Sequence, residues 1–299
     1  MSRMPAVSLV AVPGRRNRTV ELARQIEDRG FTGVYCPSIM GDAISLCVSM
    51  AHATERLEFG TSIQPIYLRR PQELAGAASY LHEVSGGRFR LGLGVSHAPA
   101  MQRMGVETGR PLGDTRDYVG SLRAAEKQVG PLPPIVLATL RDKMLALATE
   151  ISDGAVWANA ARSHMAAQLS AVEVGGEFFV GNMIPTVIDE DREAAAAVNR
   201  KSLTGYLALP NYRNYWKAAG YVEEMEAIEA ALAAGDRDRL PALMTDRWLS
   251  DCTLYGSAAQ VREGVEAWIE AGVKAPILVP SSTSGGQLKA LEELFAAYD

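Results

Sequence analysis

Two kinds of segment alternate along the chain, and each has its own pattern of apolar positions. Short runs rich in Val, Ile and Leu predict strands, and longer runs with apolar residues every three or four positions predict helices. In the run 72–84, Leu74, Ala77, Ala78 and Leu81 fall on one helical face. The expected strands are 6–12, 33–36, 57–63, 89–95, 135–138, 154–157, a segment within 178–188, and 275–279.

The helices expected between these strands decide the fold class. They are 19–29, 43–53, 72–84, 111–127, 143–151, 191–209, 258–271 and 287–298. A crossover between parallel strands needs a dozen or more residues, so this alternation predicts parallel pairing. Eight strands favour a closed (β/α)8 TIM barrel over an open doubly wound sheet. We predict one α/β domain over 1–299, with a polar helical insertion at about 201–250 before the last strand.

Composition narrows the class of partner. The chain is 47% apolar and 22% charged, which is ordinary for a soluble globular protein. Its formal charge is −5 and it has no basic stripe, so we expect neither nucleic acid nor an anionic membrane as a partner. Residues 1–18 contain no long apolar run, and no apolar stretch is long enough for a membrane span. We therefore expect a cytoplasmic protein.

Several common sites are excluded by spacing. Cys36, Cys47 and Cys252 form neither a disulfide framework nor a CxxC pair, so we expect buried thiols. The four histidines are scattered, and we predict no metal site. The run 92–94 reads Gly-Leu-Gly but lacks the third glycine of a dinucleotide fingerprint. No phosphate-binding P-loop and no GxSxG elbow occur.

Reactive groups of a barrel gather at the carboxyl ends of its strands, which selects the residues to weigh. These are Pro37, Ser38, Ile39, Met40, Ser62, Ile63, Gln64, Pro65, Tyr67, Ser96, His97, Thr139, Leu140, Arg141, Ala158, Asn159 and 280–283. His97 is the histidine at a predicted strand end, and its imidazole suits proton transfer near neutrality. The alternative is a loop histidine without a catalytic role.

An aromatic group lies in the expected insertion. It consists of Tyr206, Tyr212, Tyr215, Trp216 and Tyr221. Such a group can cover a flat cofactor or substrate. We favour the other interpretation, in which these side chains form the core of the insertion or a subunit contact.

Two motifs together resemble those of the luciferase-like oxidoreductases, the bacterial luciferase superfamily. Residues 60–71 read GTSIQPIYLRRP and look like that family's third-strand motif, and 85–95 read SGGRFRLGLGV and resemble its entry into the fourth strand. Residues 110–119 and the turn 151–154 are also similar to the family's. Residues 207–214 resemble a subgroup assigned to the deazaflavin coenzyme F420. The resemblance covers nearly the whole chain.

The resemblance implies a barrel that binds coenzyme F420, or alternatively FMN, at the strand ends with a small organic substrate above the ring. A bulge that often contains a non-prolyl cis peptide maps to Ser62-Ile63. His97 occupies the position of a group near the reacting centre, so we expect it to be the proton donor. Ser38, Gln64 and Ser96 are the expected ring-edge contacts. The family also implies a homodimer.

One segment departs from the family pattern. Relatives commonly read AALGP after the fifth strand, whereas this chain has Ala138-Thr139-Leu140-Arg141-Asp142. We place Thr139 and Arg141 among the cofactor-binding residues. The Arg141 guanidinium either pairs with a phosphate of the cofactor tail or blocks that tail.

Three functions follow from these patterns. The first is hydride transfer between F420 and a small organic substrate. The second is an FMN-dependent monooxygenase that uses reduced flavin and oxygen. The third is a cofactor-free barrel that acts as a binding or partner subunit, because fold alone does not give function. Oxygen consumption separates the first two, and failure to bind either cofactor favours the third.

Overall fold

The computed structural model describes residues 4–38 and 41–299, so Ile39 and Met40 lie outside the described residues. Within this part of the chain the protein is a closed (β/α)8 barrel of parallel strands, which confirms the predicted fold class. The barrel strands are β1 (Ala6–Ser8), β2 (Gly33–Cys36), β3 (Glu58–Thr61), β5 (Phe89–Gly94), β6 (Ile135–Ala138), β7 (Gly154–Ala158), β8 (Phe179–Ile188) and β10 (Ala275–Ser281).

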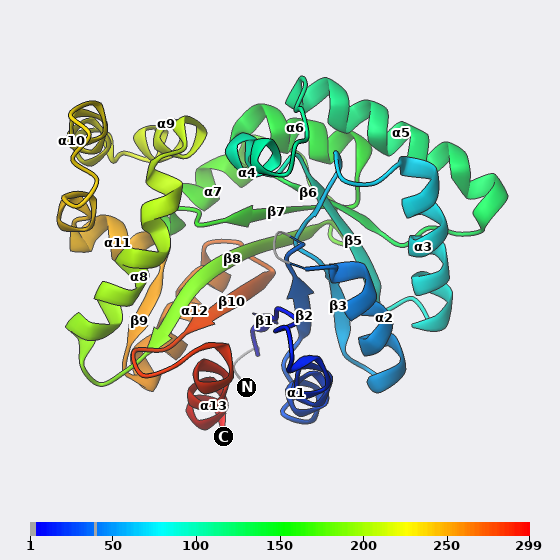
Figure 1. Cartoon of the computed structure of the whole chain (residues 1–299), viewed down its shortest axis with the longest axis horizontal. Coiled ribbons are helices and arrows are strands. Elements are labelled where there is room, and N and C mark those ends of the chain that lie inside the picture. The colour runs from blue at the N-terminus through cyan, green and yellow to red at the C-terminus, as the bar shows by residue number, and fades with distance from the viewer. Residues whose placement is uncertain (1–3, 39–40) are drawn as a thin grey trace. The chain divides into compact units, whose positions relative to one another are not determined.

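One compact unit contains residues 4–157 and 172–181. Its strands run in the order β1-β2-β3-β5-β6-β7, and the short β4 (Gln64–Pro65) pairs with β5. Figure 1 shows the early helices in sequence along the outer side of these strands. The helices are α1 (Arg16–Asp28), α2 (Ala43–Ala53), α3 (Pro71–Val84), α4 (Ala98–Arg103), α5 (Pro111–Val129) and α6 (Asp142–Ile151).

The other unit contains residues 158–171 and 182–299. Here β9 (Leu254–Gly256) pairs in parallel with β8, which also pairs with β10. The expected insertion is helical, as Figure 1 shows in yellow and orange. The helices are α7 (Arg162–Ser170), α8 (Arg192–Leu207), α9 (Pro210–Ala218), α10 (Val222–Ala233), the 3-10 turn η1 (Leu240–Leu243), α11 (Asp246–Cys252), α12 (Ala258–Glu270) and α13 (Gln287–Tyr298).

The boundaries of the predicted strands and helices lie within three residues of the observed ones, except at the end of the first strand. The first strand was expected over 6–12 but ends at Ser8. Its neighbour β2 has four residues, and the ladder between them reaches Ser8 and Tyr35. The six-residue α4 and the nine-residue α7 were not predicted, because helices this short show too few turns for a clear periodicity.

The aromatic group of the insertion forms its core. Tyr212, Tyr215, Trp216 and Tyr221 are each 5% exposed or less. The ring of Trp216 packs edge-on against Trp248 at 4.8 Å between centroids, and Tyr212 lies 5.3 Å from Trp216. These four side chains therefore act as a hydrophobic core, as the favoured interpretation expected, and only Tyr206 of the group is half-buried.

Gly92 of β5 allows this strand to pack closely against β3. A Cβ atom built on Gly92 would lie 1.9 Å from the carbonyl oxygen of Thr61, on the neighbouring strand. Only glycine fits this position, which gives the Gly-Leu-Gly run a structural reason unrelated to nucleotides.

The three cysteines are buried, as predicted. No helix in 4–38 or 41–299 is long and apolar enough to cross a membrane.

Candidate active site

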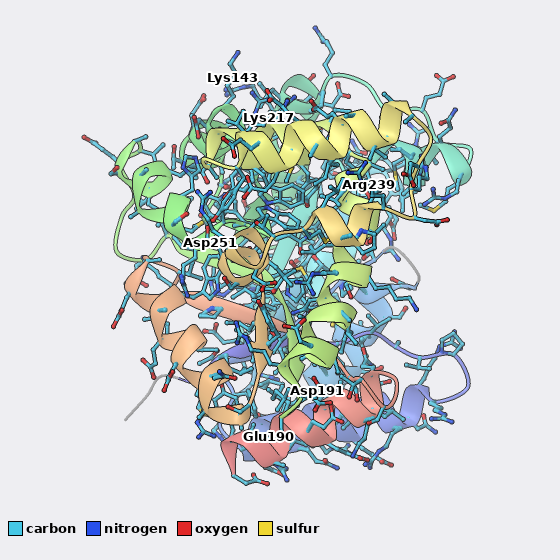
Figure 2. The ribbon with its side chains drawn as sticks, turned by 90° about the vertical axis from the view of Figure 1, so that its left-hand side faces the viewer. Lys143, Glu190, Asp191, Lys217, Arg239 and Asp251 are labelled. Atoms are coloured by element: carbon cyan, nitrogen blue, oxygen red, sulfur yellow. The ribbon has the colours of Figure 1, made fainter. Side chains whose placement is uncertain are left out.

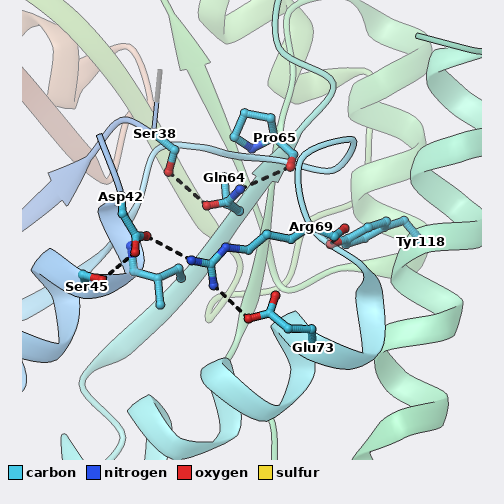
Figure 3. A network of polar contacts seen from close by, with 9 residues as sticks. Ser38, Asp42, Ser45, Gln64, Pro65, Arg69, Glu73 and Tyr118 are labelled. Atoms are coloured by element: carbon cyan, nitrogen blue, oxygen red, sulfur yellow. Dashed lines mark hydrogen bonds and ion pairs between the residues drawn. The ribbon is translucent and has the colours of Figure 1, made fainter. Parts of the chain in front are cut away.

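The side chains that follow β2 and β3 meet directly. The Ser38 hydroxyl donates to Oε1 of Gln64 at 3.1 Å, and Nε2 of Gln64 donates to the Pro65 carbonyl at 3.3 Å (Figure 3). Ser38 is 8% exposed and Gln64 3% exposed. Two of the expected ring-edge residues thus form one buried polar pair, although 25 residues separate them in the sequence.

The segment between β3 and β4 carries the bulge that the resemblance implies. The peptide bond between Ser62 and Ile63 is cis. The Ser62 amide donates to the Cys36 carbonyl at 2.8 Å, which fixes the bulge against β2. Ile63 is half-buried, and its side chain lies 3.1 Å from the position that a Cβ atom on Gly94 would take.

Ser96 stands just beyond the carboxyl end of β5. Strand pairing places Gln64 opposite Leu93 and Pro65 opposite Gly94, so Ser96 follows the strand that pairs with β4. Its backbone has a φ of 59°, which is uncommon for a residue with a side chain. Its Oγ atom is buried and has no hydrogen-bond partner among the described residues. Such an atom costs about 1–3 kcal/mol unless a ligand or water satisfies it.

Thr139 and Arg141 follow β6 and differ in burial. Thr139 is 5% exposed, and its Oγ1 atom is a second buried hydroxyl without a partner in the described part of the chain. Arg141 is exposed at the N-cap of α6, whose first turn has no side-chain cap. The guanidinium forms no ion pair with any described residue. Arg141 is therefore free to meet an anion.

His97 is the N-cap residue of α4. It is half-buried, and burial lowers the pKa of its imidazole below the usual 6.5. The neutral imidazole is therefore the main form at pH 7. Neutral histidine accepts a proton readily and donates one mainly in more acidic solution.

The loop between β4 and α3 is anchored on two sides. Nη2 of Arg69 lies 3.2 Å from Oδ1 of Asp42, and its Nη1 lies 3.3 Å from Glu73 (Figure 3). The Tyr118 hydroxyl donates to the Arg69 carbonyl at 2.9 Å. Tyr67 in the same loop donates to Asp114 at 2.8 Å, at the start of α5. These contacts hold the segment that follows Gln64.

The predicted site residues all lie in one unit and follow neighbouring strands. A direct hydrogen bond joins the Ser38–Gln64 pair, whereas the Arg141 side chain forms no ion pair with a described residue. Sequence reasoning gave no role to Asn159, which follows β7 with a φ of 56° and is 4% exposed. An Asn directly after a predicted strand is a weak signal for this conformation, since Asn tolerates it better than most residues.

The polar atoms present fit a flat ring with a polar edge. Ser96 Oγ and Thr139 Oγ1 are buried without partners, and they follow the adjacent strands β5 and β6. The Ser38–Gln64 pair adds a carboxamide and a hydroxyl. A flavin or deazaflavin has ring carbonyl and N–H groups that match hydroxyl and amide partners. The residues present therefore fit such a cofactor.

Comparison of the sequence with known families gives one match over most of its length. The model of a family described as luciferase-like monooxygenase matches residues 5–275. A relative in Mycobacterium tuberculosis, named "Putative coenzyme F420-dependent oxidoreductase Rv3520c", is 27% identical, and the alignment covers 92% of this chain and 93% of the relative.

Comparison of the structure finds similar barrels. The coenzyme F420-dependent tetrahydromethanopterin reductase from Methanopyrus kandleri has a TM-score of 0.76 at 17% identity, with 99% of this chain and 100% of that chain covered. The oxygenating constituent of 3,6-diketocamphane monooxygenase from Pseudomonas putida, in complex with FMN, has a TM-score of 0.61 at 15% identity, with 98% and 97% covered. At these identities the likeness establishes the fold.

Proposed function

The chain belongs to the luciferase-like monooxygenase family, and from this premise we propose that it is an oxidoreductase that transfers a hydride between coenzyme F420 and a small organic substrate. The observation that carries the proposal is that two buried hydroxyls without partners, Ser96 and Thr139, follow β5 and β6, and that β5 pairs with the β4 segment of the Ser38–Gln64 pair. The name of the M. tuberculosis relative supports F420 as the cofactor.

The residues of this chain have separate roles in the proposal. Ser38, Gln64 and Ser96 bind the edge of the ring, and Ser62-Ile63 backs its face. Thr139 and Arg141 bind the phosphate-bearing tail, because an exposed guanidinium at an uncapped helix N-terminus attracts an anion. When bound, the deazaflavin supplies the carbon that gives or takes the hydride. The protein's part is to orient that carbon and exclude water.

His97 is the proposed proton-transfer residue. Reduction of a carbonyl needs a proton on the substrate oxygen as the hydride arrives on carbon, and oxidation of the alcohol needs a base. Because burial lowers the pKa of His97, its neutral form suits the alcohol-oxidising direction at pH 7 and its protonated form suits carbonyl reduction in acid.

A second function, an FMN-dependent monooxygenase, is favoured by the description of the family model itself. It uses the same ring-edge residues but consumes oxygen. The third, a cofactor-free binding subunit, requires that Arg141 block the tail. The exposure of Arg141 speaks against this, since its side chain points to solvent rather than filling the site.

The test is a fluorescence titration of the purified full chain with F420 and, in parallel, with FMN. Tight uptake of F420 with little uptake of FMN supports hydride transfer. Preference for FMN, followed by oxygen consumption with the reduced flavin, moves the assignment to the monooxygenase. Binding of neither contradicts both enzyme functions. Light scattering after gel filtration tests the proposed homodimer in the same samples.

A further inference from the structure

The loop after β2 and the segment that begins with β4 are joined at two places. One is the buried hydrogen bond from Ser38 to Gln64. The other lies at the surface, where Nη2 of Arg69 is 3.2 Å from Oδ1 of Asp42 (Figure 3). Asp42 comes four positions after Ser38, and Arg69 comes five positions after Gln64. The two stretches of chain that supply these ring-edge residues are therefore also tied by an ion pair, which the proposed function leaves without a role.

Asp42 is an oriented partner in this ion pair. It is the N-cap residue of α2, and its Oδ1 atom accepts a hydrogen bond from the Ile44 amide at 3.0 Å. An N-cap carboxylate is held by the free amides of the first helical turn. The Asp42 side chain is also 44% exposed, so dissolved ions reach its charge. The helix sets the direction of the carboxylate, while solvent sets how strongly that charge is screened.

Arg69 is held at both its side chain and its backbone. Its Nη1 atom lies 3.3 Å from Glu73 on α3, and its carbonyl accepts from the Tyr118 hydroxyl of α5 at 2.9 Å. The guanidinium is planar and carries several N–H groups in fixed directions, so one arginine can meet two carboxylates at once. Its side chain is 24% exposed. Arg69 is thus a fixed cation that faces the start of α2.

The sheet holds the Gln64 side of this junction more firmly than the Ser38 side. Gln64 pairs with Leu93 of β5, and the Ile66 amide donates to the Gly94 carbonyl at 2.9 Å. The ladder between β2 and β3, in contrast, ends at Cys36, two positions before Ser38. The ion pair therefore ties the loop after β2 to a segment that strand pairing already holds.

We propose that Arg69 is a positioning residue for the cofactor ring. Its ion pair with Asp42 holds the loop after β2 against the segment 64–70, which keeps the Ser38 hydroxyl on Gln64 at the ring edge. This inference rests on the proposed function, which assigns Ser38 and Gln64 to the ring. Because salt screens a partly exposed ion pair, part of the salt dependence of F420 affinity comes from this pair and not from Arg141.

The test is a double-mutant cycle on the full chain, with F420 affinity measured by fluorescence titration in about 0.05 M sodium chloride, where screening is weak. Arg69→Gln removes the cation, and we expect F420 affinity to fall about threefold, as for a partly exposed ion pair. Asp42→Asn keeps an oxygen that caps α2 but removes the charge, and we expect the same loss. The double variant loses no more than either single variant, because both remove one interaction.

Three matched variants separate this pair from charge in general. Glu73→Gln removes the other carboxylate that Arg69 contacts, which lies four positions further along the same segment and leaves F420 affinity unchanged. Lys143→Gln removes an exposed cation of α6 (Figure 2) and also leaves it unchanged, although the change in net charge equals that of Arg69→Gln. Arg69→Lys keeps the cation without the planar fork, and we expect its affinity to lie within about twofold of the native value.

Two further measurements distinguish positioning from a general effect on the fold. In a Ser38→Ala background, Arg69→Gln is expected to cause no further loss of F420 affinity, since the hydroxyl that the ion pair positions is absent. Raising sodium chloride to about 0.5 M screens the pair, so the native chain loses more affinity than Arg69→Gln does. Thermal unfolding in the same buffers shows that each variant is folded.

The possible failures are distinct. If F420 does not bind to the native chain, the proposed function fails and this inference falls with it. If F420 binds equally well to the native chain and to Arg69→Gln, only the role of Arg69 is overturned. The same conclusion follows if Arg69→Gln causes its full loss in the Ser38→Ala background, or if Lys143→Gln weakens F420 binding as much as Arg69→Gln does.

Discussion

The hydroxyl of Ser38 donates to the carboxamide oxygen of Gln64 at 3.1 Å in a buried setting, so that the loop after β2 and the segment after β3 share one polar pair. The pair fixes which atom of Gln64 faces the Ser38 side. The remaining amide hydrogens of Gln64 are then available for the Pro65 carbonyl and for a ligand.

Replacing Ser38 by Ala breaks this pair. We expect F420 affinity to fall about fivefold, since one buried hydrogen bond contributes about 1 kcal/mol. Ser45→Ala is a matched control, because Ser45 bonds to Asp42 at the exposed start of α2. Fluorescence titration measures both variants, and equal affinity of Ser38→Ala and the native chain would remove the pair from the cofactor site.

His97 gives a pH dependence whose sign follows from burial. The pKa of its imidazole is lowered from 6.5, so the protonated form accumulates only in more acidic solution. If His97 donates the proton, kcat/KM for carbonyl reduction rises as pH falls through this lowered pKa and is small above it. The alcohol-oxidising direction shows the opposite slope.

His97→Ala is expected to remove this pH dependence of kcat/KM, whereas His52→Ala, on the exposed side of α2, retains it.

The free energy of unfolding also changes in this pH range. Because the unfolded imidazole binds protons more readily than the folded one, His97 makes the fold less stable as pH falls through 6.5. Thermal unfolding of His97→Ala between pH 7 and 5 is expected to vary less than that of the native chain. An unchanged pH profile would exclude His97 from proton transfer.

Arg141 is tested with a pair of ligands that differ by one phosphate. We expect the native chain to prefer FMN over riboflavin and Arg141→Ala to reduce this preference about tenfold, since a guanidinium–phosphate pair is a strong charge-assisted hydrogen bond. Lys143→Ala serves as the control, because Lys143 is another exposed cation two residues further on, in the first turn of α6. A gain in FMN affinity in Arg141→Gly would show instead that the arginine blocks the tail.

Arg88 is expected to matter for stability rather than binding. Its guanidinium donates to the carbonyls of Ala51, Thr54 and Leu57 and to the Thr54 hydroxyl, so it caps the end of α2. Arg88→Ala leaves these acceptors without a partner, and we expect a loss of about 3 kcal/mol in the free energy of unfolding. Arg123→Ala is a control on the exposed surface. Urea denaturation measures both, and a loss below 1 kcal/mol would contradict this role.

The sequence alone determined the fold class and the candidates at the strand ends. Strands and helices differ in the spacing of apolar residues, and this spacing is local, so all eight barrel strands begin at or within one residue of the expected position. The motifs at 60–71 and 85–95 placed Ser62, Gln64 and Ser96 after neighbouring strands, because each motif contains its own strand end.

Only the tertiary structure decided which side chains meet. Hydrogen bonds join groups that lie far apart in the sequence: Ser38 with Gln64 across 26 positions, Arg88 with Thr54 at the end of α2 across 34, and Trp216 with Asn159 across 57. No local pattern encodes such contacts. The conformation of Asn159 is an example. Its left-handed backbone is unfavourable for an isolated residue, and it exists because α9 and β8 hold the groups on either side. The physical reason is that local energies select elements, whereas the packing of distant elements selects the positions of polar atoms in the site.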